Sequence, residues 1–146
     1  MPKAQLEYQL QVQIADYLRA QYPHVLFLSD TVASVKLTMP QAVRNKRVQN
    51  PKFKCPDLII LEIRQKENFV PTEKPGFTVS YPKFAGLFIE LKKETPYKLN
   101  GEIKASQDDH LKLQWESILK LRERGYYADW CWTWESAKQI IDWYLK

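Results

Sequence analysis

The segment that most constrains the fold is residues 84–93, Phe-Ala-Gly-Leu-Phe-Ile-Glu-Leu-Lys-Lys. An apolar run of this length predicts a buried strand. Side chains alternate between the two faces of a strand, so Glu90 and Lys92 lie on one face and Leu91 on the other. Because removing unpaired charges from water is costly, a buried strand that ends in a carboxylate and an amine on one face indicates a functional site.

A second carboxylate precedes another apolar run. Pro56-Asp57 leads into residues 58–63, Leu-Ile-Ile-Leu-Glu-Ile, which predict a second core strand with Asp57 at its start. Asp57 and Glu90 offer the oxygen ligands that hard divalent cations prefer, and Lys92 places an amine beside them. The alternative is an ordinary strand that ends in surface charges. The sequence therefore indicates a metal site and leaves this alternative open.

The Glu-x-Lys pattern occurs a second time, as residues 102–104. No apolar run precedes this copy, and the stretch around it contains Pro96, Asn100 and Gly101. These residues favour turns, so we expect residues 94–105 to form a solvated loop. Only the copy at Glu90 is expected to carry chemistry.

The length and composition predict one globular domain that spans residues 1–146. Of the 146 residues, 45% are hydrophobic and 13% aromatic, which suits a chain with a proper core. The apolar runs are too short to span a membrane, and the N-terminus lacks the apolar segment of a signal peptide. Two cysteines and two histidines argue against a disulfide framework and a structural zinc site. We expect a cytoplasmic protein, and the sequence leaves a homodimer open.

The basic residues are unevenly distributed. The chain has 22 Lys and Arg against 17 Asp and Glu, a net charge of +5, and residues 31–56 contain no acid at all. Such a block favours a polyanionic partner, and the alternative is a solvated basic loop. The candidate nucleic-acid-binding residues in this window are Lys36, Arg44, Lys46, Arg47, Lys52 and Lys54.

Periodicity divides the chain into alternating helices and strands. Helices are expected at residues 3–21, 41–49, 106–124 and 134–145, and strands at 25–28, 57–64, 76–81, 84–93 and 126–132. Ser106 and Thr133 are expected to cap helices, and Gly125 to end one. This order predicts an α/β or α+β domain with a mixed sheet flanked by helices.

An amide is expected on the inner face of the third of these helices. Gln114 lies between Leu111 and Ile118 on that face. A buried amide needs hydrogen-bond partners, and a polar site next to the helix provides them. The alternative is a satisfied core amide with no role in the site.

The order of these features resembles the VRR-NUC branch of the PD-(D/E)xK nucleases, in particular its small stand-alone, phage-type members. Pro56-Asp57 and Glu90-Leu91-Lys92 match the signature of the family. Glu7 on the first helix and Gln114 on the third match two further positions, and a strand and a closing helix follow as in the family. The match covers nearly the whole chain. The excursion around residues 76–81 is longer than the family core needs, which leaves the strand pairing open.

The resemblance implies a restriction-endonuclease-like core and an endonuclease that uses Mg²⁺ or Mn²⁺ to hydrolyse DNA phosphodiester bonds, branched or flapped DNA included. It implies that Asp57, Glu90 and the carbonyl oxygen of Leu91 bind the metal. Lys92 would position water or stabilise negative charge, Glu7 would hold a metal-bound water or a second metal, and Gln114 would orient these groups.

Two other functions remain open. The first is a non-catalytic nucleic-acid-binding module of the same fold, which has no need to keep Asp57, Glu90 and Lys92 together. The second is a small structural or interaction protein, which leaves the acid-free basic window unexplained. The sequence therefore favours the enzyme. It leaves open the preferred nucleic-acid structure, DNA against RNA, and the number of metals.

Overall fold

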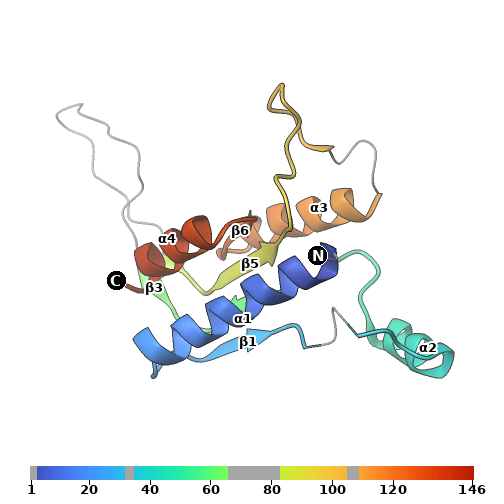
Figure 1. Ribbon diagram of the computed structural model, residues 1–146, viewed down its shortest axis with the longest axis horizontal. Coiled ribbons are helices and arrows are strands. Elements are labelled where there is room, and N and C mark those ends of the chain that lie inside the picture. Colours follow the sequence, from blue (N-terminus) through green and yellow to red (C-terminus); the bar gives the residue numbers. More distant parts are fainter. Residues whose placement is uncertain (1–2, 32–34, 66–82, 105–108) are drawn as a thin grey trace.

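The computed structural model describes residues 3–31, 35–65, 83–104 and 109–146. These residues form a mixed α and β structure (Figure 1). The elements in chain order are α1 (Lys3–Gln21), β1 (Phe27–Ser29), α2 (Met39–Val48), β2 (Leu58–Ile60), β3 (Arg64–Gln65), β4 (Lys83–Phe84), β5 (Leu87–Leu91), α3 (Asp109–Glu123), β6 (Tyr127–Cys131) and α4 (Trp134–Leu145).

The main sheet has four strands in the order β1-β2-β5-β6. The β1–β2 and β2–β5 pairs are antiparallel, and β5 and β6 are parallel, with α3 as the crossover between them. A parallel pair needs a long connection of this kind. Strands β3 and β4 form a separate two-stranded ribbon. The expected mixed sheet flanked by helices is confirmed.

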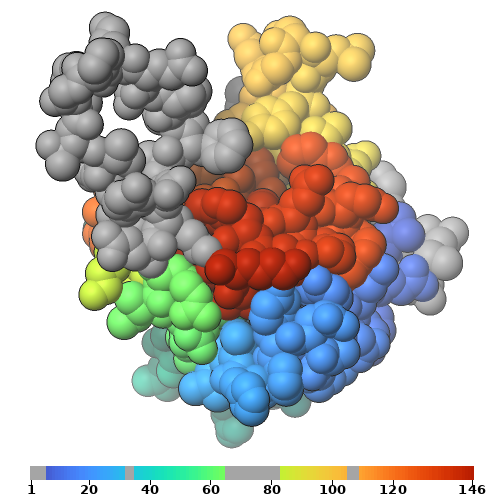
Figure 2. Space-filling model, turned by 90° about the vertical axis from the view of Figure 1, so that its left-hand side faces the viewer, coloured from blue at the N-terminus to red at the C-terminus, as the bar shows by residue number. Residues whose placement is uncertain are grey.

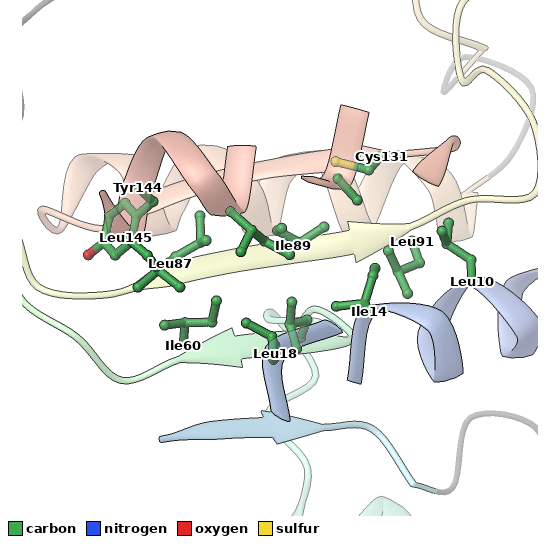
Figure 3. Close-up of a cluster of buried hydrophobic side chains, with 13 residues drawn as sticks. Leu10, Ile14, Leu18, Ile60, Leu87, Ile89, Leu91, Cys131, Tyr144 and Leu145 are labelled. Carbon is green, nitrogen blue, oxygen red and sulfur yellow. The ribbon is translucent and has the colours of Figure 1, made fainter. Parts of the chain in front are cut away.

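The helices cover both faces of the sheet. One face packs on α1 and α4 through a core that includes Leu18, Ile89 and Ile141 (Figure 3). The opposite face packs on α3 through Ile118, Leu121, Ala128 and Trp130. Because strand side chains alternate, Leu87, Ile89 and Leu91 of β5 face the first core, and Glu90 and Lys92 are directed toward α3.

Most of the expected elements are confirmed. Thr133 caps α4 by accepting a hydrogen bond from the N–H of Ser136, and Gly125 follows α3 with φ of +86°. The expected strand at 57–64 ends earlier, at Ile60, and the expected strand at 76–81 and the cap at Ser106 lie outside the described residues. Helix α2 begins two residues before its expected start, because Thr38 and Gln41 form a capping box.

A carboxylate joins the two helices that share a face of the sheet. Asp142 on α4 accepts hydrogen bonds of 2.6 Å from the hydroxyls of Tyr17 and Tyr22 and from Nζ of Lys138. Partial burial raises the pKa of Asp142, but the hydrogen bonds from Lys138 and the tyrosines outweigh it and lower the pKa below its usual range. This network fixes α1 against α4. No helix among the described residues is long and apolar enough to cross a membrane.

Candidate active site

A cleft of about 530 Å³ opens at the C-terminal end of β5, between the first turns of α1 and α3. Among the residues that line it are four carboxylates, four lysines and an amide. These are Glu7, Asp57, Glu90, Glu94, Lys54, Lys92, Lys93, Lys104 and Gln114. The cleft therefore gathers charges of both signs from segments that are far apart in the sequence.

The strand register brings the two predicted metal-binding carboxylates together. Leu58 of β2 pairs with Ile89 of β5, so the antiparallel register continues with Asp57 opposite Glu90. Residues directly opposite in such a pair have side chains on the same face, with Cβ atoms about 5 Å apart. Asp57 and Glu90 thus both face α3 at the floor of the cleft.

Gln114 connects Glu90 of β5 to Lys92, the residue that follows the strand. Its Nε2 donates a hydrogen bond to Oε1 of Glu90, and its Oε1 accepts one from Nζ of Lys92. The Nζ of Lys92 also lies 3.6 Å from Oε1 of Glu90. An amide carries both a donor and an acceptor, so Gln114 can bond the carboxyl of Glu90 and the ammonium of Lys92 at once. This contact gives the buried amide the partners that its position requires.

Asp57 and Glu7 hold the backbone at the end of β5. Asp57 Oδ2 accepts a hydrogen bond of 2.8 Å from the N–H of Leu91, and Glu7 Oε1 accepts one of 3.2 Å from the N–H of Lys93. These bonds lie on either side of Lys92 and limit the movement of its backbone. Glu7 therefore belongs to the same cleft as the other four predicted site residues.

Burial and mutual repulsion change the protonation of the two floor carboxyls. Burial raises the pKa of Glu90 to about 8, the charge of Asp57 adds to the increase, and Lys92 and Lys54 oppose it. Burial also raises the pKa of Asp57, against the hydrogen bond from Leu91 N–H. At pH 7, without further positive charge, Glu90 is thus mainly protonated.

The donor set fits a divalent cation held by two carboxylates. Among the described residues, no three His, Cys, Asp or Glu side chains cluster as metal ligands. Asp57 and Glu90 nevertheless face one cleft, and each uses only one oxygen, Oδ2 and Oε1, in hydrogen bonds between described residues. The other two oxygens remain for a cation that binds few protein ligands and keeps its waters, as Mg²⁺ does.

The residues that line the cleft differ in part from the site residues that the sequence predicts. Leu91 is buried at the end of β5 and is not among the described residues that line the cleft, whereas His110 and Leu111 of α3 line it. Lys104, expected in a solvated loop, lines the cleft too, and its Nζ donates a hydrogen bond to the carbonyl of Thr95. Whether Lys104 lies near the cleft depends on the path of residues 94–104, which a local sequence pattern does not reveal.

The basic window divides into three parts. Lys54 lines the cleft, and its backbone N–H donates a hydrogen bond to Oγ of Ser117 on α3. Lys52 lines a second pocket of about 400 Å³ with Phe53, Lys120 and Arg124. The other four residues, Lys36, Arg44, Lys46 and Arg47, are exposed on α2 or shortly before it.

Helix α2 has no buried residue and stands apart from the sheet (Figure 1). Lys46 and Arg47 lie in its last turn, and the first turn has no acid. A helix of this kind gains little from packing, so its basic side chains are free to meet a polyanion from solvent. The helix lies at the surface, and its contact with nucleic acid stays a prediction.

Gln114 provides the first test of this geometry. We expect Gln114→Leu to lower the rate of the DNA cleavage that the sequence predicts about 10-fold to 100-fold, because leucine can neither donate a hydrogen bond to Glu90 nor accept one from Lys92. The same substitution at Gln139, exposed on α4, is the matched control. Single-turnover cleavage rates and thermal melting of both variants separate the outcomes. A fully active Gln114→Leu protein would show that Gln114 only fills the core.

Glu7, Asp57, Glu90, Lys92 and Gln114 come from α1, the approach to β2, β5 and α3, and they meet in one cleft. Such an arrangement places three carboxylates, a lysine and a bridging amide around a volume large enough for a small anionic group. Comparisons with family models, curated proteins and solved structures find no match to this chain.

Proposed function

We propose that this protein is a Mg²⁺- or Mn²⁺-dependent nuclease that hydrolyses DNA phosphodiester bonds in the cleft at the end of β5, on a restriction-endonuclease-like core. The observation that carries the proposal is the meeting of Asp57, Glu90 and Lys92 at one point of the sheet, with Gln114 bonded to two of them. A binding module does not need a buried carboxyl and a lysine held in register by an amide.

Asp57 and Glu90 would hold the cation, each through the oxygen that makes no hydrogen bond among the described residues. When bound, Mg²⁺ or Mn²⁺ supplies positive charge to the scissile phosphate and makes water a better nucleophile. Glu90 must lose its proton for this, because a coordinating carboxylate is ionised. With a pKa of about 8 in the absence of the cation, Glu90 makes binding compete with protonation near pH 7.

Lys92 would act on the reacting phosphate. Its Nζ has a hydrogen bond to Gln114 and lies 3.6 Å from Glu90, which leaves further N–H donors for the substrate. Charge placed where negative charge develops stabilises a transition state. Glu7, which holds the backbone next to Lys92, is suited to retain a water or a second cation at the mouth of the cleft.

Lysines and arginines in the cleft and in the second pocket would hold the DNA backbone. Lys54 reaches the cleft itself, and Lys52, Lys120 and Arg124 line the second pocket, at the C-terminal end of α3. Contacts of this kind bind phosphates without reading sequence. Affinity should therefore fall steeply with salt.

A cleavage assay tests the proposal. End-labelled single-stranded, duplex, flapped and four-way DNA, and matching RNA, are incubated with Mg²⁺, Mn²⁺ or excess chelator. We expect cleavage with either metal and none with chelator, because the metal would supply the charge that neutralises the phosphate and activates water. Undiminished cleavage in chelator would contradict the proposal. DNA binding without cleavage under every condition would identify the protein as a non-catalytic binding module instead.

A further inference from the structure

Residues 95–104 form a hairpin that projects from the body next to the cleft. Tyr97 pairs with Ile103 in an isolated antiparallel bridge, the N–H of Lys98 donates to the carbonyl of Glu102 at 2.7 Å, and the N–H of Lys104 donates to that of Pro96 at 2.9 Å. Figures 1 and 2 show this segment, drawn in gold, rising clear of the sheet and helices. The expected solvated loop is thus a hydrogen-bonded projection.

The tip of the hairpin is a defined turn. The N–H of Gly101 donates to the carbonyl of Lys98 at 3.0 Å, and Gly101 has φ of +85°. A turn closed in this way, whose last residue is a glycine with positive φ, is a common three-residue hairpin connection. Asn100 Oδ1 accepts a further bond from the N–H of Glu102. Leu99 is therefore held at the apex, where its side chain is fully exposed.

The foot of the hairpin is anchored to the sheet. The ring of Tyr97 packs edge-on against Trp130 and Trp132, with centroids 5.8 Å and 5.9 Å apart, and its hydroxyl accepts a hydrogen bond from Nε1 of Trp130. Thr95 and Lys104, one on each arm, line the cleft. The hairpin is thus one wall of the active-site cleft and carries an apolar tip beyond it.

The reach of the hairpin suits the groove of a nucleic acid. Leu99 at the tip is the fourth residue after Thr95 at the cleft, and four residue steps of extended chain correspond to about 13 Å. The grooves of DNA are about 7.5 to 8.5 Å deep, so a projection of this length is long enough to pass the backbone and reach the bases. Apolar side chains such as leucine are known to wedge between neighbouring bases.

We propose that the hairpin of residues 95–104 is a nucleic-acid wedge, whose tip residue Leu99 inserts between bases of the DNA held in the cleft. This inference rests on the proposed nuclease function. Lys104 and Lys93, which line the cleft at the foot of the hairpin, attract the phosphates on either side of the inserted side chain. An exposed leucine gains from contact with bases because it leaves water.

The wedge should favour DNA whose base stack is already interrupted. Opening a paired, stacked step costs free energy that the burial of one leucine offsets only in part. At a flap, a branch or a nick the base stack is already interrupted in the free DNA, so the protein does not have to supply this free energy. Leu99 would then contribute to affinity at such sites and contribute little on continuous duplex, and the enzyme would be guided to them.

The test uses wild-type protein and three variants in chelator, so that no cleavage occurs. The DNA carries 2-aminopurine at the branch of a flap, and its fluorescence increases when the base is unstacked. Binding is followed independently by fluorescence anisotropy of an end label. Leu99→Ser removes the apolar tip, Leu99→Met keeps it, and Leu26→Ser changes an exposed leucine before β1. Thermal melting is expected to be unchanged in Leu99→Ser, since the side chain is fully exposed.

We expect wild type, Leu99→Met and Leu26→Ser to raise the 2-aminopurine fluorescence. Leu99→Ser should bind without this rise, and its preference for flapped over continuous duplex should fall roughly 10-fold to 100-fold. A full fluorescence rise with Leu99→Ser would overturn the wedge. If wild type cleaves DNA in Mg²⁺ but never raises the fluorescence, the wedge fails and the nuclease stands. If wild type binds no DNA, both fail.

Discussion

Lys92→Met is expected to slow DNA cleavage on the order of 100-fold to 1000-fold at saturating Mg²⁺, the usual effect of removing one group that stabilises transition-state charge. Methionine keeps most of the length and volume of lysine but has no donor and no charge. It also removes the cation next to Glu90, so the pKa of that carboxyl should rise further and more Mg²⁺ should be needed.

Lys83→Met is the matched control for this variant. Lys83 is exposed on β4, and its replacement changes the net charge of the protein by the same amount. Single-turnover rates over a range of Mg²⁺ concentrations separate the effect on chemistry from the effect on metal affinity. Equal rates for Lys92→Met and Lys83→Met at every concentration would remove Lys92 from the mechanism.

Asp57→Asn is expected to abolish cleavage while leaving the metal-free fold intact. Asparagine has nearly the same shape and keeps an oxygen that can accept the hydrogen bond from Leu91 N–H. It also removes a charge that repels Glu90. In chelator, the variant should therefore melt no lower than wild type. If Asp57 were only a structural acceptor, its neutralisation should instead cost about 1–3 kcal/mol of the free energy of unfolding.

Metal should stabilise wild type but not this variant. A ligand that binds only the folded state at 100 times its Kd adds about 2.7 kcal/mol, which corresponds to a rise in Tm on the order of 5–10 °C for a domain of this size. Asp57→Asn should lose the rise. Asp129→Asn is the control, because Asp129 is a half-buried carboxylate paired with Arg122 outside the cleft. An Asp57→Asn protein that melts lower in chelator and still cleaves DNA would overturn the assignment of this site.

The helices and the strands of the main sheet were predictable because their signals are local. The apolar spacing along α1 and α4 and the apolar runs of β2 and β5 each reflect burial against a neighbouring layer. The exact ends of these helices and strands were less predictable. Leu6, which has the same helical spacing as the buried Leu10 and Ile14 of α1, is exposed. The long expected strand at 84–93 divides into β4 and β5, where the N–H of Ala85 bonds to the carbonyl of Gly125.

The site was predictable in part for the same reason. The alternation of side chains placed Glu90 and Lys92 on one face, and helical spacing placed Gln114 on the inner face of α3. The hairpin at 95–104 was not predicted, although Asn100-Gly101 is a turn signal. Its arms lack alternating apolar residues, and the ring contacts of Tyr97 with Trp130 and Trp132 join segments more than 30 residues apart. Contacts of that kind leave no local pattern.

The most direct test of the central claim is a calorimetric titration of the protein with Mg²⁺ or Mn²⁺ at pH 7, in two buffers of different ionisation enthalpy. If Asp57 and Glu90 bind the cation together, wild type should show a saturable site and release about one proton per cation, because Glu90 must give up the proton that its pKa of about 8 lets it hold. Asp57→Asn and Glu90→Gln should show neither. Saturable binding with unchanged affinity in both variants would contradict the assignment of the cleft as the metal site.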